Sequence, residues 1–108
     1  MRLINKEVTT TADFGANFTS STIPAERAGF GSIQIQWDGT PTGTLYLETT
    51  NDLTYDYVEL QNVALSGSAG SHIFNIQSLN SAYYQVRFAY TSGTSTAKIR
   101  YLFKSADI

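Results

Sequence analysis

The 108-residue chain has no cysteine and few charged residues. The lack of cysteine excludes disulfide frameworks, thiolate zinc sites and cysteine nucleophiles. Charged residues make up 15% of the chain, well below the usual share of about a quarter, so long surface helices are not expected. No stretch approaches the roughly 18 apolar residues needed to span a bilayer, and the N-terminus lacks the apolar region of a signal peptide. We therefore expect synthesis in the cytosol and no membrane partner.

Positive charge is sparse as well. Seven Lys and Arg residues are outnumbered by nine Asp and Glu residues, which gives a formal net charge of −2. The basic residues form no uninterrupted run, whereas nonspecific binding to nucleic acid requires a dense positive field. The composition therefore argues against a nucleic-acid partner.

Motifs for nucleotide cofactors and for nucleophilic catalysis are also missing. The sequence contains neither a phosphate-binding loop of the Walker type nor the glycine motif of dinucleotide-binding folds. His72 is the only histidine, and no serine lies in a Gly-x-Ser-x-Gly elbow, so a Ser-His-Asp triad has little support. We interpret His72 as an ordinary residue at the edge of a strand. We expect no cofactor, and we predict that the protein is not an enzyme.

Acidic residues near the middle of the sequence are the remaining candidates for chemistry, since a pair of carboxylates can serve a glycosidase. These acids are Asp38, Glu48, Asp52, Asp56 and Glu59. Asn51, Asp52 and Asp56 could also offer oxygen ligands to calcium, but the alternating acids of a dedicated calcium loop are absent. Turns and solvent-facing positions explain these residues more simply. We therefore predict no catalytic residue and no metal site.

The sequence does contain many short β-favouring runs that alternate with a period of two. Residues 31–37 place Ile33, Ile35 and Trp37 on one face, which is typical of a half-buried strand. Gly-containing connections follow this run and the strong run at 82–90. We expect hairpins there, one joining 31–37 to the run at 44–49 and the other joining 82–90 to 96–103.

The number and spacing of these runs predict the fold class. Seven or eight short strands, with turns at roughly ten-residue spacing, indicate an all-β protein with an antiparallel two-sheet sandwich or jelly roll. Residues 1–108 are expected to form one domain, in which 55–60 is a short strand. Residues 1–28 are less regular, and we predict one or two edge strands there or an arm that docks onto a neighbour.

Aromatic residues are the best candidates for contacts with a ligand or a partner. Five of them could stack on a sugar ring or lie at a subunit interface: Trp37, Tyr46, Tyr55, Tyr57 and Tyr83. Aromatic residues on strands more often pack in a core or an interface, so we favour packing or assembly over sugar binding. A carbohydrate-binding module that mediates surface adhesion is the alternative.

Several turn and strand motifs between residues 30 and 103 carry a family resemblance. They are the strand ending in Trp37, the turns at 39–43 and 50–52, and the runs at 70–76 and 82–87. The chain resembles small β-sandwich proteins encoded among the virion structural genes of bacteriophages. It departs from their pattern at Thr50, where serine is usual, and at Leu53, where glycine is usual.

The resemblance implies a non-enzymatic structural role in a virus particle. Members of this group act as capsid decoration, head-fibre or tail-accessory components. The resemblance thus implies a homo-oligomer such as a trimer, located in the virion, whose partners are copies of itself and other virion proteins. A glycan on the host surface is a further partner that it implies.

Overall fold

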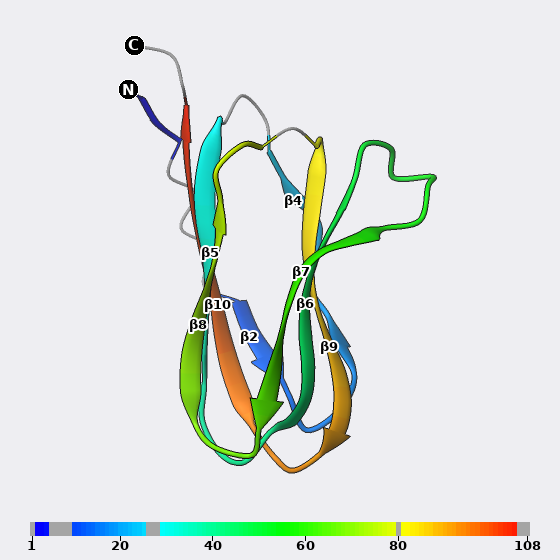
Figure 1. Cartoon of the computed structure of the whole chain (residues 1–108), viewed down its shortest axis with the longest axis vertical. Helices are drawn as coiled ribbons and strands as arrows, with labels where there is room; N and C mark the ends of the chain where they lie inside the picture. The colour runs from blue at the N-terminus through cyan, green and yellow to red at the C-terminus, as the bar shows by residue number, and fades with distance from the viewer. Residues whose placement is uncertain (1, 5–9, 26–28, 80, 106–108) are drawn as a thin grey trace.

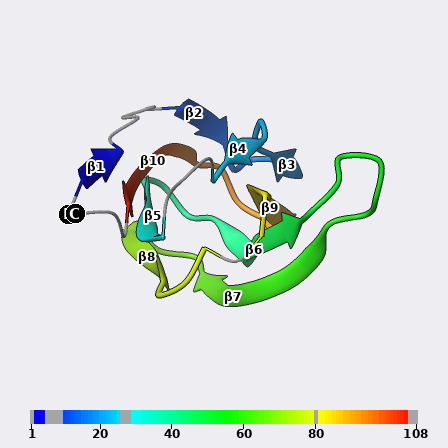
Figure 2. The same ribbon diagram turned by 90° about the horizontal axis from the view of Figure 1, so that it is seen from above.

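The computed structural model describes residues 2–4, 10–25, 29–79 and 81–105 and confirms the all-β class (Figure 1). The strands are β1 (Arg2–Ile4), β2 (Thr10–Asp13), β3 (Phe18–Thr19), β4 (Ile23–Pro24), β5 (Phe30–Trp37), β6 (Thr42–Thr50), β7 (Val58–Ser66), β8 (Gly70–Ile76), β9 (Tyr83–Ser92) and β10 (Thr96–Ser105). They form two antiparallel sheets that pack face to face (Figure 2). No helix in the described part of the chain is long and apolar enough to cross a membrane.

The strand order is that of a jelly roll. Sheet A has the order β1-β10-β5-β8, with β2 also paired to β10. Sheet B has the order β3-β9-β6-β7, with β4 also paired to β9. From β7 onward the chain alternates between the sheets, so strands that are neighbours in a sheet are distant in sequence.

The N-terminal segments explain why the described part of the chain forms ten strands where seven or eight were predicted. β1 and β2 lie end to end along β10, and β3 and β4 lie end to end along β9, so each sheet has one edge made of two short pieces. Ala12, Phe14, Ile23 and Ala25 from this part of the chain are buried in the core. The docking-arm interpretation of residues 1–28 stays a prediction.

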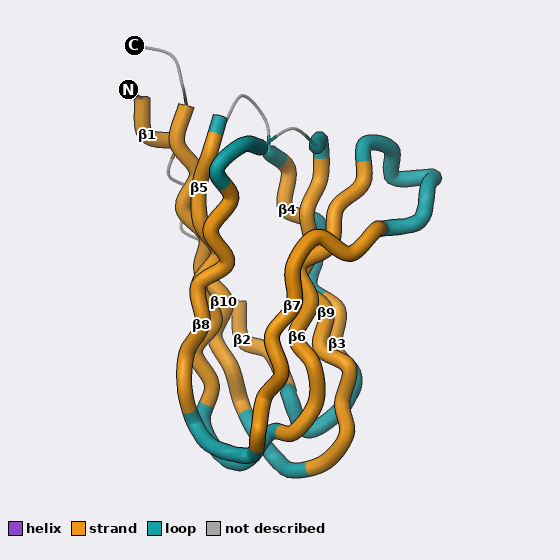
Figure 3. The backbone as a smooth tube through the Cα atoms, viewed as in Figure 1, coloured by secondary structure: helices purple, strands orange, loops and turns teal. Residues whose placement is uncertain are grey.

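Both predicted hairpins are wrong. β5 lies in sheet A and β6 in sheet B, and likewise β10 lies in sheet A and β9 in sheet B. The two glycine-containing connections are corners between sheets, and they run against each other at one end of the sandwich (Figure 3). The Thr40 amide donates a hydrogen bond to the Thr94 carbonyl at 2.9 Å. Gly39 and Gly93 have φ values of 70° and 96°, and a Cβ on either would collide with the carbonyl of Thr94 or Thr40, respectively.

The hairpin that does form joins β6 to β7, and it corrects another prediction. The expected strand at 55–60 is displaced, because residues 51–57 form the connection and β7 runs over Val58–Ser66. Tyr55 and Tyr57 favour strands but lie in the connection, because the hydrogen-bonded turn at Asp52 sets the backbone conformation there. β7 also carries a register shift opposite Leu47 and Glu48.

The core fills the space between the two sheets with the inward side chains of the strands. The predicted face of β5 is confirmed, since Ile33 and Ile35 are fully buried and Trp37 is 9% exposed. Alternate residues of β9 and β10 also face the core, where Val86, Phe88, Ile99 and Phe103 are at most 2% exposed. Phe14 stacks on Phe88 with ring centroids 4.4 Å apart, which ties the N-terminal segment to the centre of sheet B. The outward side chains are therefore the ones available for function.

Candidate functional site

The connection between β6 and β7 projects from sheet B on the side away from sheet A (Figures 1 and 2). With the start of β7 it carries large apolar side chains in water: Leu53, Tyr55, Val58 and Leu60 are 56%, 69%, 64% and 47% exposed. Among the described residues, the other large apolar side chains that are exposed, Ile73 and Tyr90, are less so at 46% and 37%. We call residues 51–60 the projecting segment.

The projecting segment is held by a turn centred on Asp52. The Thr54 amide and hydroxyl both donate to Asp52 Oδ1, at 2.9 and 2.8 Å, and the Tyr55 amide donates to the Asp52 carbonyl at 2.9 Å. Hydrogen bonds from the Thr54 amide and then its hydroxyl lower the pKa of the Asp52 carboxyl below its ordinary value. The turn therefore presents Leu53 and Tyr55 to solvent from an ordered backbone.

Tyr57 ties the projecting segment to the opposite edge of sheet B. Its hydroxyl lies 3.1 Å from the Thr22 hydroxyl, and Thr22 lies between β3 and β4, beyond β9. Strands β9 and β6 lie between these two points in the sheet, so the contact crosses the outer face of sheet B. Tyr57 is half-buried and acts as a tether, whereas Tyr55 is fully available to a partner.

The outer face of sheet B carries a closed polar cluster. Glu48 Oε2 accepts from Arg87 Nε at 2.9 Å, and Glu48 Oε1 accepts from Gln85 Nε2 at 2.8 Å. The Glu48 side chain is 9% exposed and the Arg87 side chain 39% exposed. Arg87 also lies over the Tyr46 ring, 4.2 Å from its centroid. The negative charge of Glu48 is thus neutralised within the molecule by Arg87.

The outer face of sheet A is different, because it carries exposed cations and amides. Gln34 and Gln36 on β5 pair in register with Arg100 and Lys98 on β10, and the four side chains line a depression of about 310 Å³. Ile73 on β8 pairs with Gln34 and extends this row with an exposed apolar side chain. This arrangement escaped the sequence analysis because β5 and β10 are more than 60 residues apart.

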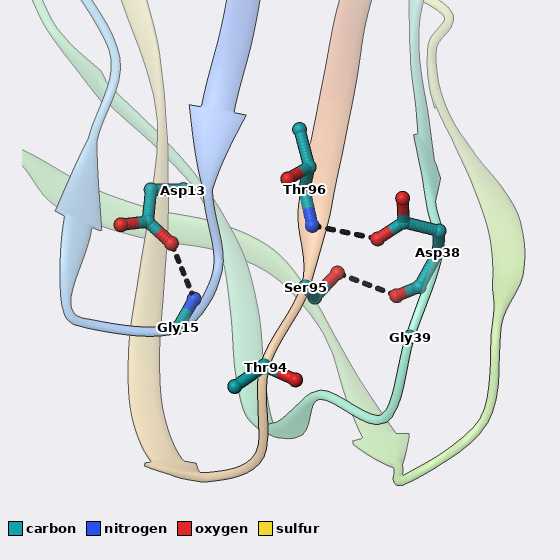
Figure 4. Close-up of a pocket in the computed structure, with 7 residues that line it drawn as sticks. All are labelled: Asp13, Gly15, Asp38, Gly39, Thr94, Ser95 and Thr96. Carbon is teal, nitrogen blue, oxygen red and sulfur yellow. Dashed lines mark hydrogen bonds between the residues drawn. The ribbon is translucent and has the colours of Figure 1, made fainter.

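A larger depression of about 640 Å³ lies at the end of the sandwich where the β5–β6 and β9–β10 connections meet, which we call the closed end (Figure 4). Its two carboxylates serve the local backbone: Asp13 Oδ1 accepts from the Gly15 amide at 2.8 Å and Asp38 Oδ1 from the Thr96 amide at 2.7 Å. Ser95 Oγ donates to the Asp38 carbonyl at 2.6 Å. These groups hold the connections together, and among the described residues no group of three or more His, Cys, Asp or Glu could hold a metal ion.

The aromatic candidates from the sequence are dispersed in the structure. Trp37 is 9% exposed in the core, where its Nε1 donates to the Ser68 carbonyl at 2.9 Å. Tyr46 and Tyr83 are half-buried on the outer face of sheet B, where Arg87 lies over one face of the Tyr46 ring. Tyr55 and Tyr57 both belong to the projecting segment, and of the five candidates Tyr55 alone is classed as exposed.

The polar candidates are also separated from one another. His72 lies on β8 at the edge of sheet A, with its ring edge against Phe74 at a centroid distance of 4.7 Å. Asp52, Asp56 and Glu59 lie in the projecting segment, Glu48 lies on the outer face of sheet B, and Asp38 lies at the closed end. The calcium candidate Asn51 Oδ1 accepts from the Ala82 amide at 3.0 Å and so holds β9. The acids thus lie on three different parts of the surface.

Comparisons with known proteins identify the fold. No protein-family model matches the chain, and no curated protein matches it. Among solved structures, a subunit of the Bacillus endospore appendages, described as disulfide-linked pili, is similar with a TM-score of 0.62 and 7% identity, over 98% of this chain and 90% of that one. The SPBc2 prophage-derived protein YomS has a TM-score of 0.51 and 10% identity, over 91% and 96% of the two chains. A CBM4 structure has a TM-score of 0.54 and 15% identity, over 95% and 77%. The chain therefore shares a β-sandwich fold with structural and carbohydrate-binding proteins.

Proposed function

We propose that this protein is a non-enzymatic structural subunit of a virus particle that works through protein–protein contacts with copies of itself and with other virion proteins. The observation that carries this proposal is the projecting segment, in which four large apolar side chains stand in water, two on an ordered turn and two at the start of β7. Exposed apolar patches on soluble proteins usually mark interaction sites. The segment supplies the aromatic and aliphatic anchors that dominate interface energies.

The similar structures support an assembly role. The fold recurs in a pilus subunit and in a prophage-derived protein, and both are similar over at least nine-tenths of either chain. The prophage protein is in keeping with the resemblance to bacteriophage virion proteins. Capsid decoration, a head fibre and a tail accessory remain the positions proposed within the particle.

The first test is the mass of the purified chain in solution, measured by light scattering over a range of concentrations. An assembly subunit is expected to give a closed oligomer or a growing series well above the 11.9 kDa monomer. A trimer would agree with the resemblance. A monomer at every concentration, together with absence of the chain from purified particles, would contradict the proposal.

Carbohydrate binding is the second candidate function, and the polar cluster on the outer face of sheet B favours it. Tyr46, Glu48, Gln85 and Arg87 combine an aromatic ring with hydrogen-bond donors and acceptors on one sheet face. Sugar recognition uses such a combination of ring stacking and fixed polar groups. The CBM4 structure provides a carbohydrate-binding relative of the fold.

A glycan array with the wild-type protein and a Tyr46→Ala variant tests this second function. Binding that Tyr46→Ala abolishes, but that Tyr55→Ala leaves intact, would place a sugar on sheet B. No binding to any glycan would remove the support for this function. Binding lost only in Tyr55→Ala would move the site to the projecting segment.

A further inference from the structure

Two surfaces on opposite sides of the molecule complement each other in charge and in polarity. The projecting segment carries three acids, Asp52, Asp56 and Glu59, and no Lys or Arg. The outer face of sheet A carries Lys98 and Arg100 beside the exposed Ile73. The projecting segment therefore carries negative charge and the outer face of sheet A positive charge, and both surfaces also carry exposed apolar side chains.

The geometry prevents one molecule from satisfying both surfaces by itself. The projecting segment extends from sheet B on the side away from sheet A (Figure 1), while Lys98 and Gln36 are exposed on the outer face of sheet A. The whole thickness of the sandwich lies between them. Contact between the two surfaces requires a second molecule.

We propose that the projecting segment of one copy docks on the outer face of sheet A of a second copy, in a head-to-tail contact. This inference rests on the proposed assembly function and names the surfaces that would carry it. The occupant of the sheet A face is thus a second copy of this chain. A head-to-tail contact joins unlike surfaces, so it repeats into a ring where the rotation closes and into a filament where it does not.

The features of the two surfaces suit this contact. The depression of about 310 Å³ between Gln34, Gln36, Lys98 and Arg100 is large enough to receive a side chain such as Leu53 or Tyr55. Asp56 and Glu59 would then lie near Lys98, and opposite charges at an interface fix the register and speed association. The turn at Asp52 orders the segment before binding, which lowers the entropy lost on docking.

One acid lies at the border of the sheet A face. Asp38 lies beside Lys98 at the closed end, where one of its oxygens accepts the Thr96 amide. Asp38 therefore partly compensates the positive charge of Lys98 on that side. The proposed contact approaches from the middle of the face, toward Gln34 and Ile73, where no acid among the described residues lines the depression.

Complementation between two variants tests the contact directly. A segment variant carries Leu53→Ser and Tyr55→Ser, and a face variant carries Lys98→Glu. Each variant alone is expected to lose self-association by at least about tenfold. An equimolar mixture retains one intact segment and one intact face, so it is expected to form a heterodimer of about twice 11.9 kDa and nothing longer. Sedimentation velocity measures these masses.

Matched controls separate this contact from general effects of mutation. Lys104→Glu makes the same charge change on β10, six residues or about 20 Å from Lys98, and it should leave association unchanged. Tyr90→Ser removes an exposed aromatic residue outside the projecting segment and should also have no effect. Circular dichroism confirms that each variant is folded.

A charge swap provides the final arm of the test. Adding Asp56→Lys to the Lys98→Glu chain restores opposite charges across the contact, so association should recover at least tenfold. An oligomeric wild type whose mass is unaffected by Lys98→Glu, or a mixture without heterodimer, would overturn the head-to-tail contact and leave the assembly function standing. A wild type that is monomeric at all concentrations would overturn the head-to-tail contact, and its absence from purified particles as well would overturn both proposals.

Discussion

The outer faces of the two sheets carry charge in opposite ways. On sheet B, Glu48 lies almost buried against Arg87 and Gln85, so the charges neutralise each other within the molecule. On sheet A, Lys98 and Arg100 stand exposed beside two glutamines. A net charge of −2 hides this separation. The comparison teaches that Glu48 and Arg87 on sheet B serve the fold, whereas Lys98 on sheet A is exposed to contacts from outside.

The largest expected effect comes from breaking the closed cluster on sheet B. Arg87→Met should lower the free energy of unfolding by about 1–3 kcal/mol, because it leaves the nearly buried Glu48 carboxylate without its cation. The exposed part of Arg87 keeps the effect below that of a fully buried pair. Lys98→Met on sheet A should change the same quantity by less than about 0.5 kcal/mol.

Urea denaturation of the two variants measures this difference. Adding Glu48→Gln to Arg87→Met should recover part of the loss, because it removes the uncompensated charge. Equal destabilisation by Arg87→Met and Lys98→Met would contradict the contrast between the two faces.

A smaller effect is expected where the two sheets meet along their free edges. Gln61 Nε2 on β7 donates to the Asn75 carbonyl on β8 at 2.8 Å, which links sheet B to sheet A. Gln61→Leu removes this exposed bond and should cost about 0.5–1 kcal/mol in thermal unfolding. Gln77→Leu, an exposed glutamine just after β8, is the matched control and should cost less. A larger loss from Gln77→Leu would contradict the link.

The smallest effect concerns the turn that orders the projecting segment. The folded-state pKa of Asp52 lies below the ordinary 3.8, so the turn contributes its stability above that pH and loses it as the pH falls through the lowered pKa. Thr54→Ala removes the hydroxyl donor but keeps the amide donor, so the pKa should rise only part of the way to 3.8. NMR titration of the Asp52 carboxyl carbon measures both values. An unchanged pKa in Thr54→Ala would contradict the role of the hydroxyl.

The sequence pattern of residues 31–37 predicted which side of that strand faces the core. Ile33 and Ile35 on β5 are buried as their alternation indicated, and Val86 and Phe88 on β9 follow the same period. This succeeded because the period of two is a local property of an extended backbone. It failed at residues 55–57, where β-favouring tyrosines lie in a turn set by Asp52 and Thr54.

The candidate site was only partly accessible from the sequence. Tyr55 was among the five aromatic candidates, and it is the one that stands free in water. Leu53, Val58 and Leu60 were not recognised as exposed contact residues, because a strand at 55–60 would be expected to bury its apolar side chains in the core. Trp37 shares a face with Ile33 and Ile35, and it lies in the core with them and donates to the Ser68 carbonyl.

The sequence by itself determined the all-β class, the inward faces and the positions of the chain reversals, because propensity, alternation and glycine conformations are local. The tertiary structure decided which reversals are hairpins and which are corners between sheets. It also decided that Lys98 would lie beside Gln36 and Glu48 beside Arg87. These pairings join residues about 40 to 60 positions apart, and they arise only when two sheets bury their apolar faces against each other.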